Sequence, residues 1–147
     1  MTPLKHILIV NGPNLNLLGE REPEIYGAET LDQINAELES NHPEYKLQFF
    51  QSNHEGAIID FLQQHRKSCK ALIINPGGLT HYSVALRDAV AGCQYVAVEV
   101  HLSDIYSREA FRQVSLIKDV CVAQISGHGK SGYAEAIKRL QDHWDSH

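Results

Sequence analysis

The sequence predicts an α/β protein of one domain, residues 1–147, built around a parallel sheet of five strands. Short apolar runs rich in Val and Ile recur along the chain, and helix-like segments separate them. Most of these runs do not alternate strictly between apolar and polar residues, which is typical of strands covered by helices on both faces. A chain of 147 residues can also bury a complete core without metals or disulfides.

The strand-like runs are followed by helix-like segments, so the chain reads as consecutive βαβ units. Right-handed crossovers then favour the flavodoxin-like, doubly wound order 2-1-3-4-5. The five predicted strands are residues 5–10, 46–52, 70–75, 95–100 and 119–125.

Four further segments have the composition of helices. Thr30 followed by Gln33 is a capping-box pattern at the start of the first. Asn53 is a candidate N-cap for the second, and Gly92 is expected to end the third. The predicted helices are residues 31–40, 56–67, 83–92 and 133–145.

Charge and composition argue against several classes of partner. The net charge is -5 and the pI is about 5.9, so neither nucleic acid nor an anionic membrane is expected to attract the chain. No CxxC pair occurs among the three cysteines, Cys69, Cys93 and Cys121. We expect them to be free thiols in a reducing cytosol. No signal peptide or membrane-spanning run is evident, so we expect a soluble cytoplasmic protein.

The predicted architecture places a ligand site beyond the carboxyl ends of the strands. Three stretches rich in polar side chains follow strands one, three and four: residues 11–27, 75–83 and 99–109. With the segments that follow them, they carry these candidate residues: Asn14, Asn16, Arg21, Glu22, Tyr26, Asn75, Thr80, His81, Asp88, Glu99, His101, Ser103, Arg108 and Arg112.

These residue types suit acid/base chemistry on an anionic substrate. Histidine transfers protons near neutral pH, tyrosine acts as a base beside a cation, and arginine binds carboxylates. Glu99 and His101 are two apart on a strand and therefore share a face, where the carboxylate would favour a charged imidazole. Taken singly, each residue has a plainer interpretation as a packing or surface group, and this pair as a surface salt bridge.

Three long motifs resemble those of one enzyme family. "NGPNLNLLGEREPEIYG" closely resembles the N-terminal signature of the type II 3-dehydroquinate dehydratases, or type II dehydroquinases. "NPGGLTHYSVALRDA" and "EVHLSDIYSREAFRQVS" are similar to their second and third signatures. The resemblance implies reversible anti elimination of water from 3-dehydroquinate, giving 3-dehydroshikimate, in the shikimate pathway or in quinate breakdown. It implies an enol or enolate intermediate, no metal or other cofactor, and a homododecamer built as a tetramer of trimers.

The resemblance also implies roles for the motif residues. Tyr26 would be the base that removes the proton next to the ketone, and Arg21 would stabilise its tyrosinate. Asn14 would stabilise the enolate through a bound water. His101 would protonate the departing hydroxyl, and Glu99 would orient and charge His101.

Substrate binding is assigned by the same resemblance. Asn75, His81 and Arg112 would hold the substrate's hydroxyls, and the backbone amides of Leu102 and Ser103 would take its carboxylate.

The long segment at residues 11–27 is interpreted as a lid over this site. Arg108 would belong to the lid system, and Asp88 would enter the site from a neighbouring subunit. The sequence departs from the common family pattern at Gly78, Leu79 and Tyr82, which flank His81 rather than replace it, and no catalytic group is lost.

Three other interpretations compete. "GKS" at 129–131 follows a predicted strand and opens a predicted helix, as the phosphate-binding loop of an NTPase does. That motif, however, needs a Gly where this chain has Gln124. A receiver-type signalling module would need acidic residues after the first strand, where Asn11 and Gly12 stand. A metal site would have to combine histidines without close ligand spacing: His81, His101 and His128.

Overall fold

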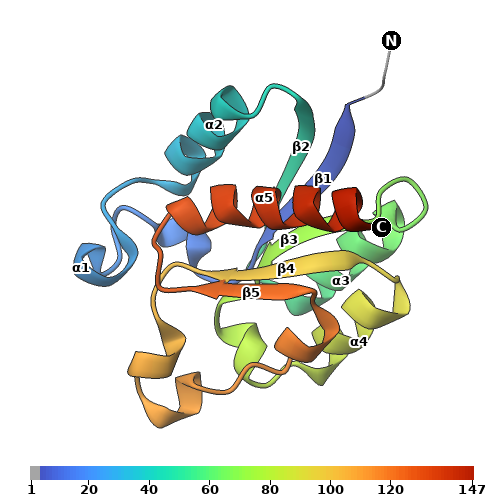
Figure 1. Cartoon of the computed structure of the whole chain (residues 1–147). Coiled ribbons are helices and arrows are strands. Elements are labelled where there is room, and N and C mark those ends of the chain that lie inside the picture. Colours follow the sequence, from blue (N-terminus) through green and yellow to red (C-terminus); the bar gives the residue numbers. More distant parts are fainter. Residues whose placement is uncertain (1–3) are drawn as a thin grey trace.

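The fold is a single parallel sheet of five strands in the order β2-β1-β3-β4-β5, as the sequence predicted (Figure 1). The computed structural model describes residues 4–147. The strands are β1 (Lys5–Asn11), β2 (Tyr45–Gln51), β3 (Ala71–Asn75), β4 (Val96–His101) and β5 (Ala123–Ser126).

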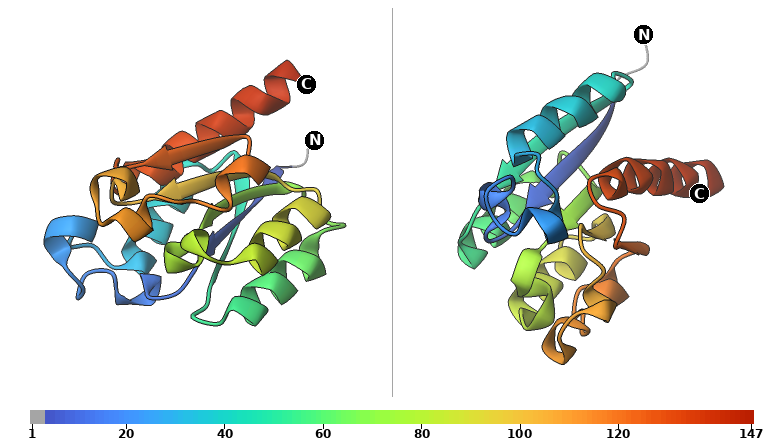
Figure 2. Two further views of the ribbon diagram at one scale, coloured as in Figure 1. Left: turned by 90° about the horizontal axis from the view of Figure 1, so that it is seen from below. Right: turned by 90° about the vertical axis from the view of Figure 1, so that its left-hand side faces the viewer.

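Helices cover both faces of the sheet (Figure 2). The α-helices are α1 (Pro23–Tyr26), α2 (Leu31–Asn41), α3 (Glu55–His65), α4 (Val84–Gly92) and α5 (Ser131–Ser146). Short 3-10 helices are η1 (Leu15–Leu17), η2 (Gly77–His81), η3 (Ile105–Ser107), η4 (Ala110–Arg112) and η5 (Lys118–Val120).

The central strands contribute side chains to two separate hydrophobic cores, one on each face of the sheet. In β1, Ile7 and Ile9 pack with α2 and α5, whereas Leu8 and Val10 pack with α3 and α4. All four side chains are fully buried. This two-sided burial explains why the run is apolar throughout instead of alternating.

Local capping partly follows the prediction. Thr30 and Gln33 form the capping box of α2: the Thr30 backbone N–H donates to Gln33 Oε1 at 2.9 Å, and the Gln33 N–H donates to Thr30 Oγ1 at 3.2 Å. The predicted cap at Asn53 is wrong. Its side-chain oxygen instead accepts from the Asn14 N–H at 2.9 Å, so it holds the loop after β1. Helix α4 ends at Gly92, as expected.

The fifth strand is shorter than predicted. Residues 119–125 were expected to be extended, but η5 (Lys118–Val120) occupies the start of this run and β5 begins at Ala123. The Val120 and Cys121 N–H groups bond locally, to Ile117 and Lys118 carbonyls. The fully buried Ile117 anchors that turn in the α3/α4 core, and short apolar runs of this kind do not distinguish a strand from a helical segment.

The loops at the carboxyl ends of the strands meet at one end of the molecule. The segments after β1 and β4 lie side by side there, away from the start of β1 and the end of α5 (Figures 1 and 2). The loops after β1 and β3 approach so closely that a Cβ at Gly12 would lie 2.5 Å from the Pro76 carbonyl oxygen. Across residues 4–147, no helix has the length and apolarity that crossing a membrane requires.

Candidate active site

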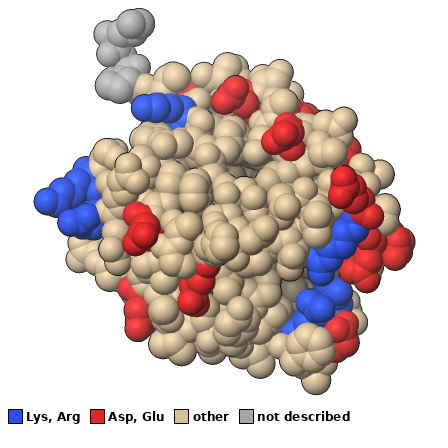
Figure 3. Space-filling model, turned by 180° about the vertical axis from the view of Figure 1, so that it is seen from behind, with Lys and Arg blue, Asp and Glu red and all other residues tan. Residues whose placement is uncertain are grey.

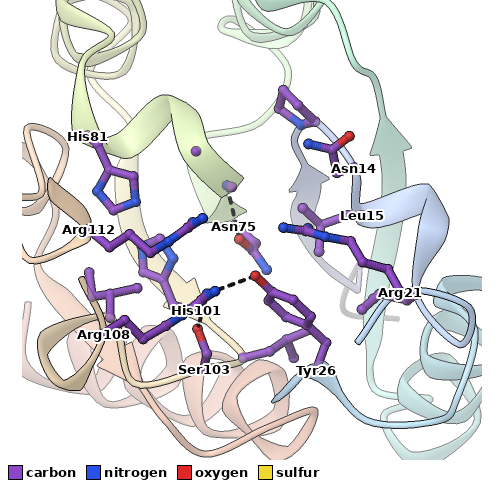
Figure 4. A pocket seen from close by; sticks show the side chains of 16 residues that line it. Asn14, Leu15, Arg21, Tyr26, Asn75, His81, His101, Ser103, Arg108 and Arg112 are labelled. Atoms are coloured by element: carbon purple, nitrogen blue, oxygen red, sulfur yellow. Dashed lines mark hydrogen bonds between the residues drawn. The ribbon is translucent and has the colours of Figure 1, made fainter. Parts of the chain in front are cut away.

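A cavity of about 270 Å³ opens at this end of the sheet. Three segments build it: the long loop after β1, the η2 turn after β3, and the segment after β4. The predicted site residues that line it are Asn14, Arg21, Tyr26, Asn75, His81, His101, Leu102, Ser103, Arg108 and Arg112 (Figure 4). Glu99 lies behind His101, and Asp88 is exposed on α4, outside this cavity.

The cavity is cationic although the chain is acidic overall. Arg21, Arg108 and Arg112 line it, and no Asp or Glu is among its described lining residues. Arg21 and Arg112 point their guanidinium groups inward from opposite sides (Figure 4). The net charge of -5 therefore says little about this site, which is suited to a small anion.

Tyr26 is held between two of these arginines. Arg108 Nη1 donates a hydrogen bond to the Tyr26 hydroxyl at 2.8 Å (Figure 4). The Arg21 guanidinium carbon lies 4.6 Å from the centre of the Tyr26 ring. The family resemblance assigns to Arg21 the role of stabilising the tyrosinate. Arg21 lies over the ring, whereas the cation that contacts the hydroxyl is Arg108. A cationic donor at this oxygen stabilises negative charge on it.

His101 and Glu99 form a buried pair, as their spacing on β4 predicted. His101 Nε2 lies 2.5 Å from Glu99 Oε2. Glu99 is fully buried and His101 is 5% exposed, so this is no surface salt bridge. Burial alone opposes ionisation of Glu99, but hydrogen bonds from His101, Thr80 and Ser115 outweigh it, and the pKa of Glu99 lies below its ordinary value.

The amide of Asn75 is fixed by neighbours that the sequence analysis missed. Its Oδ1 accepts from the Gly77 N–H at 3.1 Å, and its Nδ2 donates to the Tyr133 hydroxyl at 3.3 Å. Tyr133 itself donates to the Asn11 side chain. In the sequence, Tyr133 is indistinguishable from an ordinary core residue of an amphipathic helix, so only the fold reveals its contact with Asn75.

Two further lining residues are tied to their surroundings. His81 Nδ1 lies 2.8 Å from the Val114 carbonyl oxygen, so this nitrogen carries the hydrogen. Arg112 Nε donates to Glu109 Oε2 at 2.9 Å. The first bond ties η2 to the segment just after η4, and the second lies within the segment that contains η4.

The competing sites do not form. Lys130, of the "GKS" stretch, pairs with the carboxylates of Glu29 and Glu37 and is not free for a phosphate. His128 pairs with Glu135 at 2.6 Å, on an exposed surface. Within the described part of the chain, no three His, Cys, Asp or Glu residues are grouped closely enough to hold a metal ion.

Comparisons with known proteins agree with these motifs. Residues 5–141 match the family model described as dehydroquinase class II. The chain is 50% identical over 139 residues to the 3-dehydroquinate dehydratase of Halothermothrix orenii, covering 93% of this chain and 94% of that protein. It is 53% identical over 136 residues to that of Janthinobacterium sp. (strain Marseille), covering 90% and 94%. The crystal structure of type II dehydroquinase from Butyrivibrio crossotus superimposes with a TM-score of 0.91 at 42% identity, covering 94% and 98% of the two chains.

Proposed function

Because the chain belongs to the class II dehydroquinase family, we propose that it is a hydro-lyase that interconverts 3-dehydroquinate and 3-dehydroshikimate. One observation carries the proposal: a single cationic cavity presents both an arginine-bound tyrosine and a buried Glu–His pair. The substrate is a hydroxylated carboxylic acid with an acidic C–H next to its ketone. Such a molecule needs a base, an acid and a cationic site, and the cavity offers each.

Tyr26 acts as the base in this proposal. Its tyrosinate removes the proton next to the ketone, and the electron pair moves into an enolate. Arg108, through its hydrogen bond to the hydroxyl, and Arg21, over the ring, stabilise the tyrosinate. Asn14 lines the cavity in a left-handed conformation (φ 71°), with its N–H bound by Asn53. It stabilises the enolate oxygen, directly or through a water.

His101 acts as the general acid. When the enolate collapses, the C–O bond breaks and the hydroxyl leaves as water with a proton from His101. Glu99 holds Nε2, so Nδ1 is the nitrogen left for this transfer. The buried carboxylate of Glu99 also fixes the orientation of the imidazole that gives this proton.

The remaining lining residues bind the substrate. Asn75, His81 and Arg112 hold its hydroxyls, and the backbone amides of Leu102 and Ser103 hold its carboxylate. The fixed amide of Asn75 supports this role, because its neighbours determine which polar atoms face the cavity.

The segment at 11–27 acts as a lid on this single catalytic domain. No residue of α1 is fully buried, and Tyr26 packs only partly buried against the core on the α2/α5 side. The Tyr26–Arg108 bond closes it against the segment after β4 and helps to exclude water from the cavity.

Assembly into a homododecamer, a tetramer of trimers, completes the proposal. Large apolar side chains stay exposed in one chain at Tyr82, Val84, Phe111 and Val114. On the side of the sheet away from α5, the middle of the surface is mostly uncharged (Figure 3). Such surfaces favour subunit contacts. Asp88, exposed on α4, would then reach the cavity of a neighbouring copy.

The enzyme would serve the shikimate pathway or quinate breakdown in the cytoplasm, without metal or other cofactor. Its three cysteines are free thiols, which suits a reducing compartment. The test is direct: 3-dehydroquinate is added to the purified protein with a metal chelator, and the ultraviolet absorbance of the conjugated enone is followed. A rise supports the proposal. Absence of turnover in the folded, assembled protein would refute it.

A further inference from the structure

A second layer of hydrogen bonds leads away from the Glu99 carboxylate. Gln124 Nε2 donates to Glu99 Oε1 at 2.9 Å. The Tyr106 hydroxyl donates to Gln124 Oε1 at 2.6 Å. His101, Glu99, Gln124 and Tyr106 therefore form one continuous chain from the cavity wall to a tyrosine that is 41% exposed.

Strand register produces this chain. In the β4·β5 ladder, Glu99 pairs with Gln124 and His101 pairs with Ser126. Partners in register place their side chains on the same face of the sheet. Ser126 Oγ accepts from the Ile105 N–H at 3.2 Å, which holds the start of η3, where Tyr106 lies.

The donors around Glu99 are neutral. Thr80 Oγ1 lies 2.5 Å from Oε2, Ser115 Oγ lies within 2.9 Å of both oxygens, and Gln124 binds Oε1. None of them adds a charge, so His101 is the one titratable side chain among the groups bonded to Glu99.

Other titratable groups near this carboxylate do not compete with His101. Burial, with a smaller effect from Glu99, raises the pKa of the Cys121 thiol to about 12, so the thiol stays neutral. Lys118 lies beside Tyr106, at the exposed end of this chain of hydrogen bonds, with its Nζ 5.8 Å from the centre of the Tyr106 ring.

We propose that Gln124 and Tyr106 are positioning residues for the proton donor. Gln124 fixes Oε1 of Glu99, so that Oε2 stays aimed at His101. Tyr106 fixes the Gln124 amide, because a flipped amide would set its oxygen against the carboxylate and its nitrogen against the tyrosine donor. This inference rests on the proposed role of His101 as general acid.

Gln124→Leu removes one donor from a buried carboxylate. The proton affinity of Glu99 should rise, so the lowest-pH limb of the pH–rate profile, which reports protonation of Glu99, should move to higher pH by about half a unit to one unit. At neutral pH kcat should fall about two- to tenfold, whereas KM should stay nearly unchanged, because neither residue lines the cavity. Tyr106→Phe should shift the limb in the same direction by less, since Gln124 itself remains.

The chain contains a matched control. At the amino-terminal end of β2, away from the cavity, the Tyr45 hydroxyl donates to Gln141 Oε1 at 2.7 Å, and Gln141 Nε2 donates to Asp145 Oδ1 at 2.9 Å. This is the same Tyr–Gln–carboxylate order, between β2 and α5. Gln141→Leu should therefore alter stability at most, and leave the pH–rate profile in place.

The experiment compares kcat and KM from pH 4 to 9 for the wild type, Gln124→Leu, Tyr106→Phe and Gln141→Leu. A shift in both Gln124→Leu and Tyr106→Phe, absent from Gln141→Leu, is the expected result. If the wild type is active and neither variant shifts the limb, the inference is refuted while the proposed function stands. An inactive wild type refutes the proposed function itself. Should Gln124→Leu fail to fold, Tyr106→Phe decides, because it removes only one hydroxyl from a residue that is 41% exposed.

Discussion

Tyr26→Phe removes a single oxygen atom from the cavity and leaves the ring in place. That oxygen is the acceptor for Arg108 at 2.8 Å, whereas the ring keeps its contact with Arg21 at 4.6 Å. If Tyr26 is the base, the variant loses general-base catalysis, typically worth about 10²–10⁴ in rate. This corresponds to about 3–5 kcal/mol in the activation free energy. Substrate affinity should change little, because the proposed binding groups, such as Asn75 and Arg112, are untouched.

The assay is steady-state enone formation, with KM and kcat determined separately. Tyr45→Phe is the control, since it also removes one hydroxyl hydrogen-bonded to a neighbouring side chain, far from the cavity. We expect kcat to fall at least 100-fold in Tyr26→Phe and less than twofold in Tyr45→Phe, as rough bounds from the size of base catalysis. A Tyr26→Phe enzyme with kcat within about threefold of the wild type would remove tyrosine from the mechanism.

Three further changes test other parts of the proposed site and the proposed assembly. Arg108→Met should lower kcat about 10- to 150-fold, because a hydrogen bond to a charged group is worth about 1.5–3 kcal/mol; steady-state kinetics check this, and an unchanged kcat would contradict it. Glu99 has a pKa below its ordinary 4.5, so its contribution to stability is present above that pH and is lost as the pH falls through the folded-state value. The difference in unfolding free energy between wild type and Glu99→Gln should therefore shrink in denaturant titrations as the pH drops below about 4.5. Val84→Glu puts a charge on an exposed apolar surface and should lower the assembled mass measured by light scattering, whereas an unchanged mass would place the contacts elsewhere.

The fold followed from the sequence because its signals are local and repeated. Two-sided apolar runs, the Thr30 capping box and the alternation of strands with helices each depend on neighbouring residues. Errors arose where a tertiary contact replaced a local one. Asn53 binds the loop after β1 instead of capping α3, and the buried Ile117 turns the chain where strand had been predicted.

For the cavity, too, local signals could be predicted from the sequence and tertiary contacts could not. Its lining residues could be named from motifs that follow the strands, and the Glu99–His101 pair from a spacing of two on one strand. Contacts between distant segments could not be derived in this way. The Arg108–Tyr26 bond spans 82 positions, and the bond from Gln124 to Glu99 depends on strand register that no spacing reveals.

The two proposed proton-transfer groups stand on parts of the fold that differ in rigidity. His101 ends an interior strand, and its partner Glu99 is fully buried among hydroxyl and amide donors. Tyr26 stands on α1, a short helix with no buried residue, and meets Arg108 from a different segment. In the proposed mechanism the acid would therefore be preorganised before substrate arrives, whereas the base would gain its hydroxyl-bound cation only when segment 11–27 lies against the segment after β4. Closure would then switch on the base and exclude water in one movement, so that proton abstraction waits until the substrate is enclosed.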